Sequence, residues 1–158
     1  MRKNLKRILI SAGIIGLIAV VAVAYMYNQP HRNVENSSTD FKLTAQLLVD
    51  EYLQDADAAN VKYLADDGES KILEVSGDIG SIDTDLEGKT IAYLNPENSN
   101  AAVSCTFSLG NEDKTAQLKA GDQVVVKGVI RSGASYDEDL QLYEDVIMEK
   151  CYLINKKI

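Results

Sequence analysis

The chain has 158 residues and a formal net charge of -8, with 16 lysines and arginines, 24 acidic residues and one histidine. This length fits one ordinary domain behind a short leader. An excess of acid has the wrong sign for a phosphate-binding surface, so the composition argues against nucleic acid as a partner. The acid favours solubility, and weak contacts with cationic partners or divalent ions are the alternative.

An uncharged, mostly apolar run covers residues 8–27, directly after the four cations of residues 1–7. At about 1.5 Å per residue, a helix of this length spans roughly 30 Å, the thickness of the hydrocarbon core of a bilayer. Cations on the N-terminal side predict that residues 1–7 are cytoplasmic and that everything from Asn28 onward is extracytoplasmic, on the periplasmic side. We therefore predict a single-pass transmembrane signal anchor over residues 8–27.

A cleaved signal peptide is the alternative to this anchor. Residues 22–24 (AVA) resemble a cleavage site behind a shorter apolar core at residues 8–21. The anchor is favoured because the run exceeds the usual signal core of about 7 to 15 residues, and because Tyr25 and Tyr27 suit the membrane interface. Neither cysteine lies near this segment, which excludes lipid attachment at an N-terminal cysteine.

The exported part begins with a linker and a helix. Residues 28–40 are polar, contain a proline and lack apolar periodicity, which predicts a linker between the membrane and a domain over residues 41–158. Leucines and tyrosines between residues 43 and 64 recur near helical spacing with acids between them, which predicts an amphipathic helix from about Thr44. Its alanine-rich second half extends the helix or forms a second turn.

From Lys71 onward the chain consists of short β-rich runs separated by Gly, Asn, Asp and Ser, which is typical of an all-β barrel or sandwich. The predicted strands cover residues 72–82, 89–94, 101–109, 123–131 and 145–154, with a turn or short helix at 115–120. Gly77 and Gly80 predict a bent or bulged first strand, as a barrel corner needs. The predicted fold class is therefore mainly β, a five-stranded Greek-key barrel of the OB type.

A series of motifs runs in one order along residues 44–155: Leu48-x-x-x-Tyr52, Asp57-Ala58-Ala59, Lys62-Tyr63, Val75-x-Gly77 with Ile82, Val103-x-Cys105-x-Phe107, Leu118-x-x-Gly121-Asp122-x-Val124-x-Val126-Lys127-Gly128 and Cys151-x-Leu153. In this order they resemble the tRNA-anti-like family of bacterial OB-fold proteins. The resemblance implies a barrel similar to anticodon-binding domains, in proteins that are mostly exported lipoproteins or membrane-tethered. Here a membrane helix stands in place of the lipidated cysteine. The resemblance implies a fold, and it does not establish nucleic-acid binding.

Cys105 falls in the third predicted strand and Cys151 in the fifth, and these two strands are neighbours in an OB barrel. In an export compartment they could form a disulfide, worth about 4 kcal/mol in the chain-entropy model for a loop of this length. Two buried free thiols are the alternative, because strand pairing cannot be assigned to within one residue from sequence. Cys105 and Cys151 are thus a disulfide candidate, and no Cys-x-x-Cys motif predicts redox catalysis.

No pattern in the sequence predicts a catalytic residue, a cofactor or a metal ligand, so we expect no enzyme. The single histidine, His31, lies in the expected linker, which leaves no Ser-His-Asp set, Cys-His pair or two-histidine metal site. Residues 83–88 (DTDLEG) match the first half of a calcium loop, but its twelfth position is Leu94 in place of an acid. A turn between the first two strands is the preferred interpretation.

OB domains most often bind ligands on the face of their second and third strands, where rings stack on single-stranded nucleic acid. The third strand is expected to point inward with Val103, Cys105, Phe107 and Leu109. Its outward side chains, without a ring or a cation, are then Ala102, Ser104, Thr106 and Ser108. The expected face therefore lacks what nucleic-acid binding requires.

Two classes of function follow. The first is a membrane-anchored extracytoplasmic OB-fold module that is non-catalytic and binds or scaffolds an envelope protein, peptide or other ligand of unassigned identity. The alternative is a domain that binds single-stranded nucleic acid or an oligosaccharide, in which Tyr93, Tyr136 or Tyr143 would stack on the ligand. Exposed tyrosines beside a cleft would favour the alternative, and a smooth acidic barrel would favour the scaffold. The ligand-binding residues and the oligomeric state remain open.

Overall fold

The structure is a computed structural model that describes residues 16–25, 33–65 and 69–157. The chain divides into two compact units, Met1–Arg32 and Asn33–Ile158. In the first unit, residues 16–25 are helical. Among the described residues no helix has both the length and the apolar character to cross a membrane. The predicted cytoplasmic segment and the two ends of the predicted anchor, residues 1–15 and 26–27, lie outside the described residues.

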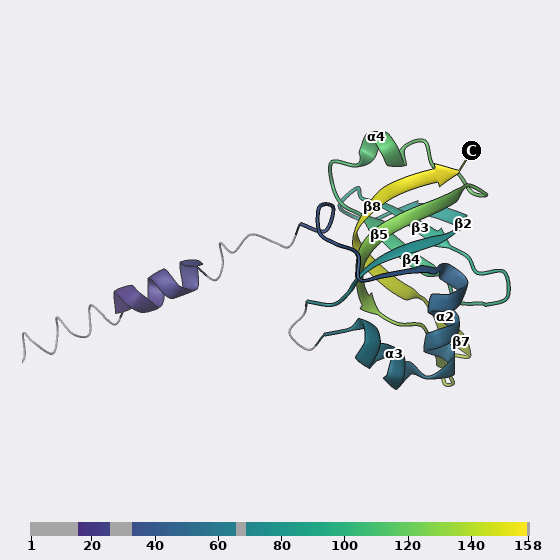
Figure 1. Cartoon of the computed structure of the whole chain (residues 1–158), viewed down its shortest axis with the longest axis horizontal. Helices are drawn as coiled ribbons and strands as arrows, with labels where there is room; N and C mark the ends of the chain where they lie inside the picture. The colour runs from purple at the N-terminus through teal and green to yellow at the C-terminus, as the bar shows by residue number, and fades with distance from the viewer. Residues whose placement is uncertain (1–15, 26–32, 66–68, 158) are drawn as a thin grey trace, which may run out of the picture. The chain divides into compact units, whose positions relative to one another are not determined.

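The second unit is built around a closed barrel (Figure 1). Its five strands are β2 (Ile72–Thr84), β3 (Thr90–Leu94), β4 (Val103–Phe107), β5 (Gln123–Ser132) and β8 (Val146–Lys157). They pair in the order β2-β3-β4-β8-β5, and β5 pairs back with β2 to close the barrel. The β4–β8 pairing is parallel and the other four are antiparallel. The predicted mainly-β, five-stranded OB-type fold is confirmed.

The predicted helix is two helices with a break between them. α2 (Ala45–Gln54) follows the short strand β1 (Phe41–Thr44), which pairs in parallel with β2. Thr44 caps α2 by accepting a hydrogen bond from the amide of Leu47 at 3.1 Å. Asp55 has an extended backbone and caps α3 (Ala56–Tyr63) by accepting from the amide of Ala58 at 3.0 Å. Asp55 thus ends α2 and begins α3. Because its extended backbone cannot continue a helix, the chain forms two helices in place of one.

Two glycines let elements of the unit approach closely. α2 buries Tyr52, whose ring lies against Gly133, where an added Cβ would come within 1.9 Å of a ring carbon. A Cβ at Gly128 on β5 would lie 2.6 Å from Sγ of Cys151 on β8. Any side chain at either position would overlap atoms of the core, so the packing depends on glycine at both.

Three features of the barrel differ from the sequence-based expectation. The connection from β5 to β8 contains a hairpin of β6 (Ser135–Asp137) and β7 (Leu142–Glu144), which the sequence did not predict. The short helix α4 (Glu112–Thr115) begins before the expected turn at residues 115–120. Leu109 is 65% exposed and does not point inward, because β4 ends at Phe107 and a turn follows.

Residues 33–40, which we call the N-terminal strap, lie against the barrel although they belong to the expected linker over 28–40. Val34 is only 1% exposed and forms a small apolar cluster with Ile72 and Val129. The backbone amide of Asp40 donates to the carbonyl of Ile72 at 2.8 Å. A single buried valine in a polar segment gives no periodic pattern, so the sequence predicted a solvated linker for these residues.

Candidate functional site

The outer face of β3, β4 and β8 carries half-buried and exposed side chains, which alternate along each strand with side chains that point into the core. On β4, Val103, Cys105 and Phe107 are buried, as predicted, while Ser104 and Thr106 are half-buried. Tyr93 of β3 pairs with Ser104, so its ring lies on the same outer face as the hydroxyl. The part of the face formed by β4 is therefore small and polar, and Tyr93 of the neighbouring strand β3 adds a ring.

The β6–β7 hairpin adds two tyrosines, with their rings in contact, next to this face. Tyr136 and Tyr143 are directly paired across the hairpin, and their ring centroids are 4.8 Å apart. They are 48% and 38% exposed. The hairpin turn is closed by the amide of Leu140, which donates to a carboxylate oxygen of Asp137 at 2.8 Å. The sequence analysis named both tyrosines as candidate ligand-binding residues. It did not predict the hairpin, although two tyrosines on either side of a polar turn are a pattern that indicates one.

A shallow groove of about 410 Å³ joins the hairpin to the barrel. It is lined by Tyr93, Ser104, Ser132, Glu144, Asp145 and Ile147. Asp145 fixes the base of the hairpin, because its carboxylate accepts from the amide of Ala102 at 2.7 Å, just before β4. The walls of the groove therefore come from five strands, β3, β4, β5, β7 and β8, and from the residue that joins the hairpin to β8.

Apolar and acidic side chains cover the hairpin and its junction with β8, and we call this region the acidic-aromatic surface. Its exposed apolar residues are Tyr136, Leu140, Leu142, Tyr143 and Ile147, between 38% and 67% exposed. Its acids are Asp137, Glu138, Asp139, Glu144 and Asp145, and residues 135–147 contain no lysine, arginine or histidine. Such a surface repels phosphates and offers apolar contact area, which suits a partner with apolar and positively charged groups.

Two cations of β5, Arg131 and Lys127, are engaged within the protein. Arg131, close to the end of β5, donates to a carboxylate oxygen of Glu149 at 2.9 Å. The lysine of the Val126-Lys127-Gly128 motif is buried, with 6% of its surface exposed. Neither side chain therefore contributes a free positive charge for a nucleic-acid backbone.

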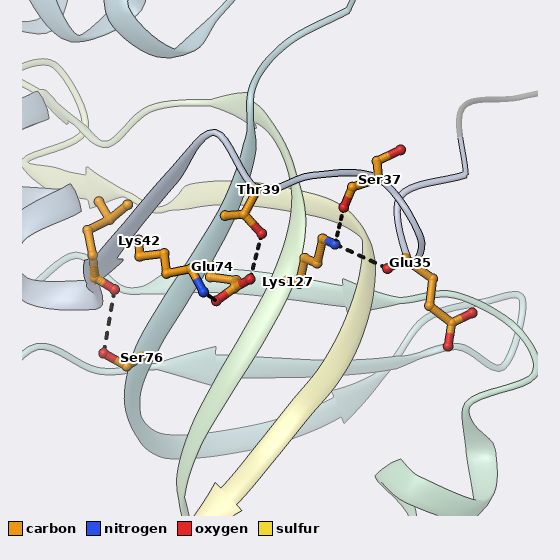
Figure 2. A network of polar contacts seen from close by, with 8 residues as sticks. Glu35, Ser37, Thr39, Lys42, Glu74, Ser76 and Lys127 are labelled. Atoms are coloured by element: carbon orange, nitrogen blue, oxygen red, sulfur yellow. Dashed lines mark hydrogen bonds and ion pairs between the residues drawn. The ribbon is translucent and has the colours of Figure 1, made fainter.

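Lys127 holds the N-terminal strap instead (Figure 2). Its Nζ donates to the carbonyl of Glu35 at 3.1 Å and to the carbonyl of Ser37. Beside it, Glu74 accepts from the hydroxyl of Thr39 and forms an ion pair with Lys42 at 2.7 Å. Hydrogen bonds from Lys42 and then Thr39 lower the pKa of Glu74. The network fixes residues 35–42 on the outside of β2 and β5.

The two cysteines lie on adjacent strands inside the barrel, as the topology predicted, but both are free thiols in the structure. The expected disulfide is therefore not present. Burial, followed by a hydrogen bond with Cys105, raises the pKa of Cys151 well above its usual range. A thiol in this state is a poor nucleophile and a poor metal ligand, so the pair fills the core as two small apolar side chains.

The remaining candidates from the sequence do not form a site together. Of the acids at residues 83–88, Asp83 lies near the end of β2, and Asp85 and Glu87 lie in the β2–β3 turn. The Asp85 carboxylate accepts from the backbone amides of Glu87 and Lys89 at 2.9 and 2.8 Å. This is the turn that was preferred over a calcium loop. In the described part of the chain, no group of three potential metal ligands is found. His31 lies outside the described residues.

The strand order and the grooved outer face define an OB-fold domain, and the sequence narrows the assignment further. The sequence pattern of the tRNA_anti-like family matches residues 1–142, so the chain belongs to this family. The expected family is thereby confirmed. No curated protein matches the chain in sequence.

Several solved structures are similar to part of the chain. An OBody, NL8, bound to hen egg-white lysozyme is 22% identical with a TM-score of 0.38, over 56% of this chain and 99% of that one. A second OBody, AM3L09, bound to the same lysozyme is 21% identical with a TM-score of 0.38, over 55% and 84%. A chain of the S. pombe Stn1-ten1 complex is 19% identical with a TM-score of 0.36, over 56% and 62%.

Proposed function

We propose that this protein is a non-catalytic binding module that holds a protein or peptide partner on its acidic-aromatic surface. The observation that carries the proposal is the combination of exposed rings and leucines with carboxylates and no cation on one hairpin. Large apolar side chains left in contact with water commonly mark protein interaction sites. Charge of one sign around them selects partners of the opposite sign and accelerates their association.

Site-directed photocrosslinking in cells that express the full chain tests this function. A photoreactive phenylalanine analogue at position 136 should crosslink to a discrete protein or peptide. The same analogue at position 61, where Val61 is 87% exposed on α3, is the matched control and should not. Adding the substitution Leu140→Ser should abolish the crosslink from position 136. Equal crosslinking from both positions, or none from 136, would refute the proposal.

An oligosaccharide ligand is the second candidate, because the half-exposed rings of Tyr136 and Tyr143 lie beside a groove and offer apolar faces on which a sugar ring can pack. Single-stranded nucleic acid is less compatible with the five surrounding carboxylates. Fluorescence anisotropy with a labelled single-stranded oligonucleotide at low salt, and the same measurement with a labelled neutral oligosaccharide, separates these ligands. Saturable sub-micromolar binding of either would replace the protein partner as the preferred ligand.

We further propose that residues 8–27 anchor the module in a membrane with residues 1–7 in the cytoplasm and the OB domain outside it. The length and apolar character of the run and the preceding cations support this orientation. A C-terminal reporter that is active only outside the cytoplasm should then be active. Activity of a cytoplasm-only reporter at the same end would overturn the orientation, and a mature chain that lacks residues 1–24 would show a cleaved signal peptide.

A further inference from the structure

A second cavity lies on a different part of the barrel and shares no lining residue with the groove beside Tyr93. Its volume is about 320 Å³, near the lower end of ligand pockets in proteins. It opens where β2 changes neighbours, since β1 pairs with β2 as far as Ser76 and β3 pairs with β2 from Ile79 onward. Gly77 and Asp78 lie between the two partners and line the cavity together with the start of α2.

Five of the fourteen residues that line this cavity, which we call the amide pocket, carry amide side chains. They come from α2, the β3–β4 loop, β5 and β8, and they are Gln46, Asn95, Asn98, Gln123 and Asn155. The side chain of Gln46 is hydrogen-bonded within the protein. Its oxygen accepts from the backbone amide of Asn98 at 3.2 Å, and its nitrogen donates to the carboxylate of Asp50 at 2.8 Å. This bonding connects α2 to the loop and holds one wall of the pocket in place.

Three of the other amides have free hydrogen-bonding capacity. The side chains of Asn95, Gln123 and Asn155 make no hydrogen bond to any part of the chain that the structure describes. The side-chain amide of Asn95 lies directly over Gly80, since a Cβ added at this glycine would be 2.1 Å from its nitrogen. A primary amide carries two donors and one acceptor oxygen, so the pocket offers several unused groups of both kinds.

The rest of the lining restricts the class of ligand. It contains no lysine, arginine, histidine or aromatic ring, and its two charged residues are Asp78 and Glu97. Phosphates and carboxylates are therefore repelled, and no ring is available to stack on a nucleobase or a sugar. The ligand that fits carries no negative charge and is rich in paired donors and acceptors.

We propose that the amide pocket binds a short, uncharged peptide segment through its main chain. Each peptide unit supplies one N–H donor and one C=O acceptor, which the amides of Asn95, Gln123 and Asn155 match on both sides. Val124 and Val125 of β5 give the pocket an apolar lining that accommodates small side chains. The site is separate from the acidic-aromatic surface, so the two bind independently.

Titration of the full-length chain with acetyl-tetraalanine amide, followed by NMR, tests this site directly. The side-chain NH₂ signals of Asn95, Gln123 and Asn155 should shift together and saturate with one dissociation constant. The NH₂ signal of Asn60, an exposed amide on α3 outside the pocket, is the internal reference and should not move. No saturable shift at millimolar peptide would overturn the proposal.

Substitutions then separate pocket binding from unspecific effects. Gln123→Leu and Asn155→Leu should each raise the dissociation constant about threefold to tenfold, the range expected for one lost hydrogen bond. Asn60→Leu is the matched control and should leave it unchanged. Val125→Trp, which fills the pocket with a ring, should abolish binding, and an unchanged amide spectrum elsewhere shows that each variant is folded.

The choice of probe decides the ligand class. Maltotriose and inorganic phosphate, titrated in the same way, should cause no shift of the pocket amides. Saturable binding of maltotriose with the peptide inactive would overturn the peptide assignment in favour of a sugar. Binding of phosphate would contradict the argument from charge. Because these readouts do not involve residues 135–147, they are independent of the partner proposed for that region.

Discussion

The helices α2 and α3 and the β6–β7 hairpin differ in how many of their side chains are paired or packed within the chain. Between α2 and α3, the carboxylate of Glu51 accepts hydrogen bonds from Nζ of Lys62 at 2.7 Å and from the hydroxyl of Tyr63 at 2.8 Å. The same ammonium lies 4.7 Å from the centroid of the Tyr63 ring and 5.5 Å from that of Phe41. On the β6–β7 hairpin, five acids face no cation of their own segment and two rings stay half-exposed.

This difference separates groups that stabilise the fold from groups that are available to a partner. A side chain with its hydrogen bonds and packing complete within the chain contributes to the unfolding free energy. An exposed leucine or an unpaired surface acid contributes little to it, so its presence is better explained by binding. Substitutions on the helix side should therefore reduce stability, and substitutions of the exposed apolar residues on the hairpin should mainly reduce binding.

The largest effects on stability are expected where Tyr52 packs against Gly133, and Gly133→Ala tests this contact. The added Cβ would lie 1.9 Å from the ring of Tyr52, so the ring must leave its buried position or the β5–β6 connection must move. We expect the unfolding free energy to fall by about 3 kcal/mol, comparable to removing a large core side chain. Urea denaturation of the purified chain measures it.

A double-mutant cycle isolates the cause of that loss. Tyr52→Ala alone should cost about 3 to 5 kcal/mol, and adding Gly133→Ala to it should cost little more, because the overlapping ring is gone. Additive losses would mean that Gly133 matters for another reason than its contact with Tyr52. Tyr52→Phe should be close to neutral, since the buried hydroxyl has no hydrogen-bonding partner in the described part of the chain.

The sequence predicted the strands of the barrel well because each carries its own local signal. Alternation on β4 fixed which residues are buried, and the topology placed Cys105 beside Cys151. The sequence could not predict the burial of Val34, because this valine is buried only by contact with residues about 40 and 95 positions further along the chain. The amide pocket was missed for the same reason: its five amides come from four segments and form no motif.

Lys127→Met should cause the next largest loss, confined mainly to the N-terminal strap. Methionine keeps the apolar stem but removes the ammonium that binds the carbonyls of Glu35 and Ser37. A loss of about 1 to 2 kcal/mol is expected, together with faster hydrogen exchange in residues 33–40. Lys42→Met is the matched control, because this lysine is 73% exposed and its ion pair with Glu74 should be worth less than about 1 kcal/mol. Equal effects would argue against a specific role of the buried lysine.

Glu51→Gln should reduce the dependence of stability on acid pH. The hydrogen bond from Lys62 is the largest cause that lowers the pKa of Glu51 below its ordinary 4.5. A lowered carboxyl pKa contributes stability that is present above pH 4.5 and is lost as the pH falls through the folded-state value. Because the pair is partly exposed, the effect at pH 7 should stay below about 1 kcal/mol.

Urea titrations at several pH values from 7 downward measure this contribution. Lys62→Met should flatten the acid side of the profile in the same way, because it removes the group that lowers the pKa. A steep acid loss that persists in both variants would show that Glu74, whose pKa is lowered by Lys42, or another acid dominates.

The smallest change in stability is expected from Leu140→Ser on the hairpin, and this variant tests the contrast most directly. Leu140 is 67% exposed, so its removal should change the unfolding free energy by no more than about 0.5 kcal/mol. Leu48→Ala is the matched control on α2, where the leucine is fully buried and the loss should reach about 2 to 5 kcal/mol. If Leu140→Ser instead cost as much as the buried substitution, the hairpin leucine would belong to the packing of the domain. The acidic-aromatic surface would then have lost its main argument, because apolar groups that the fold itself requires do not indicate a partner.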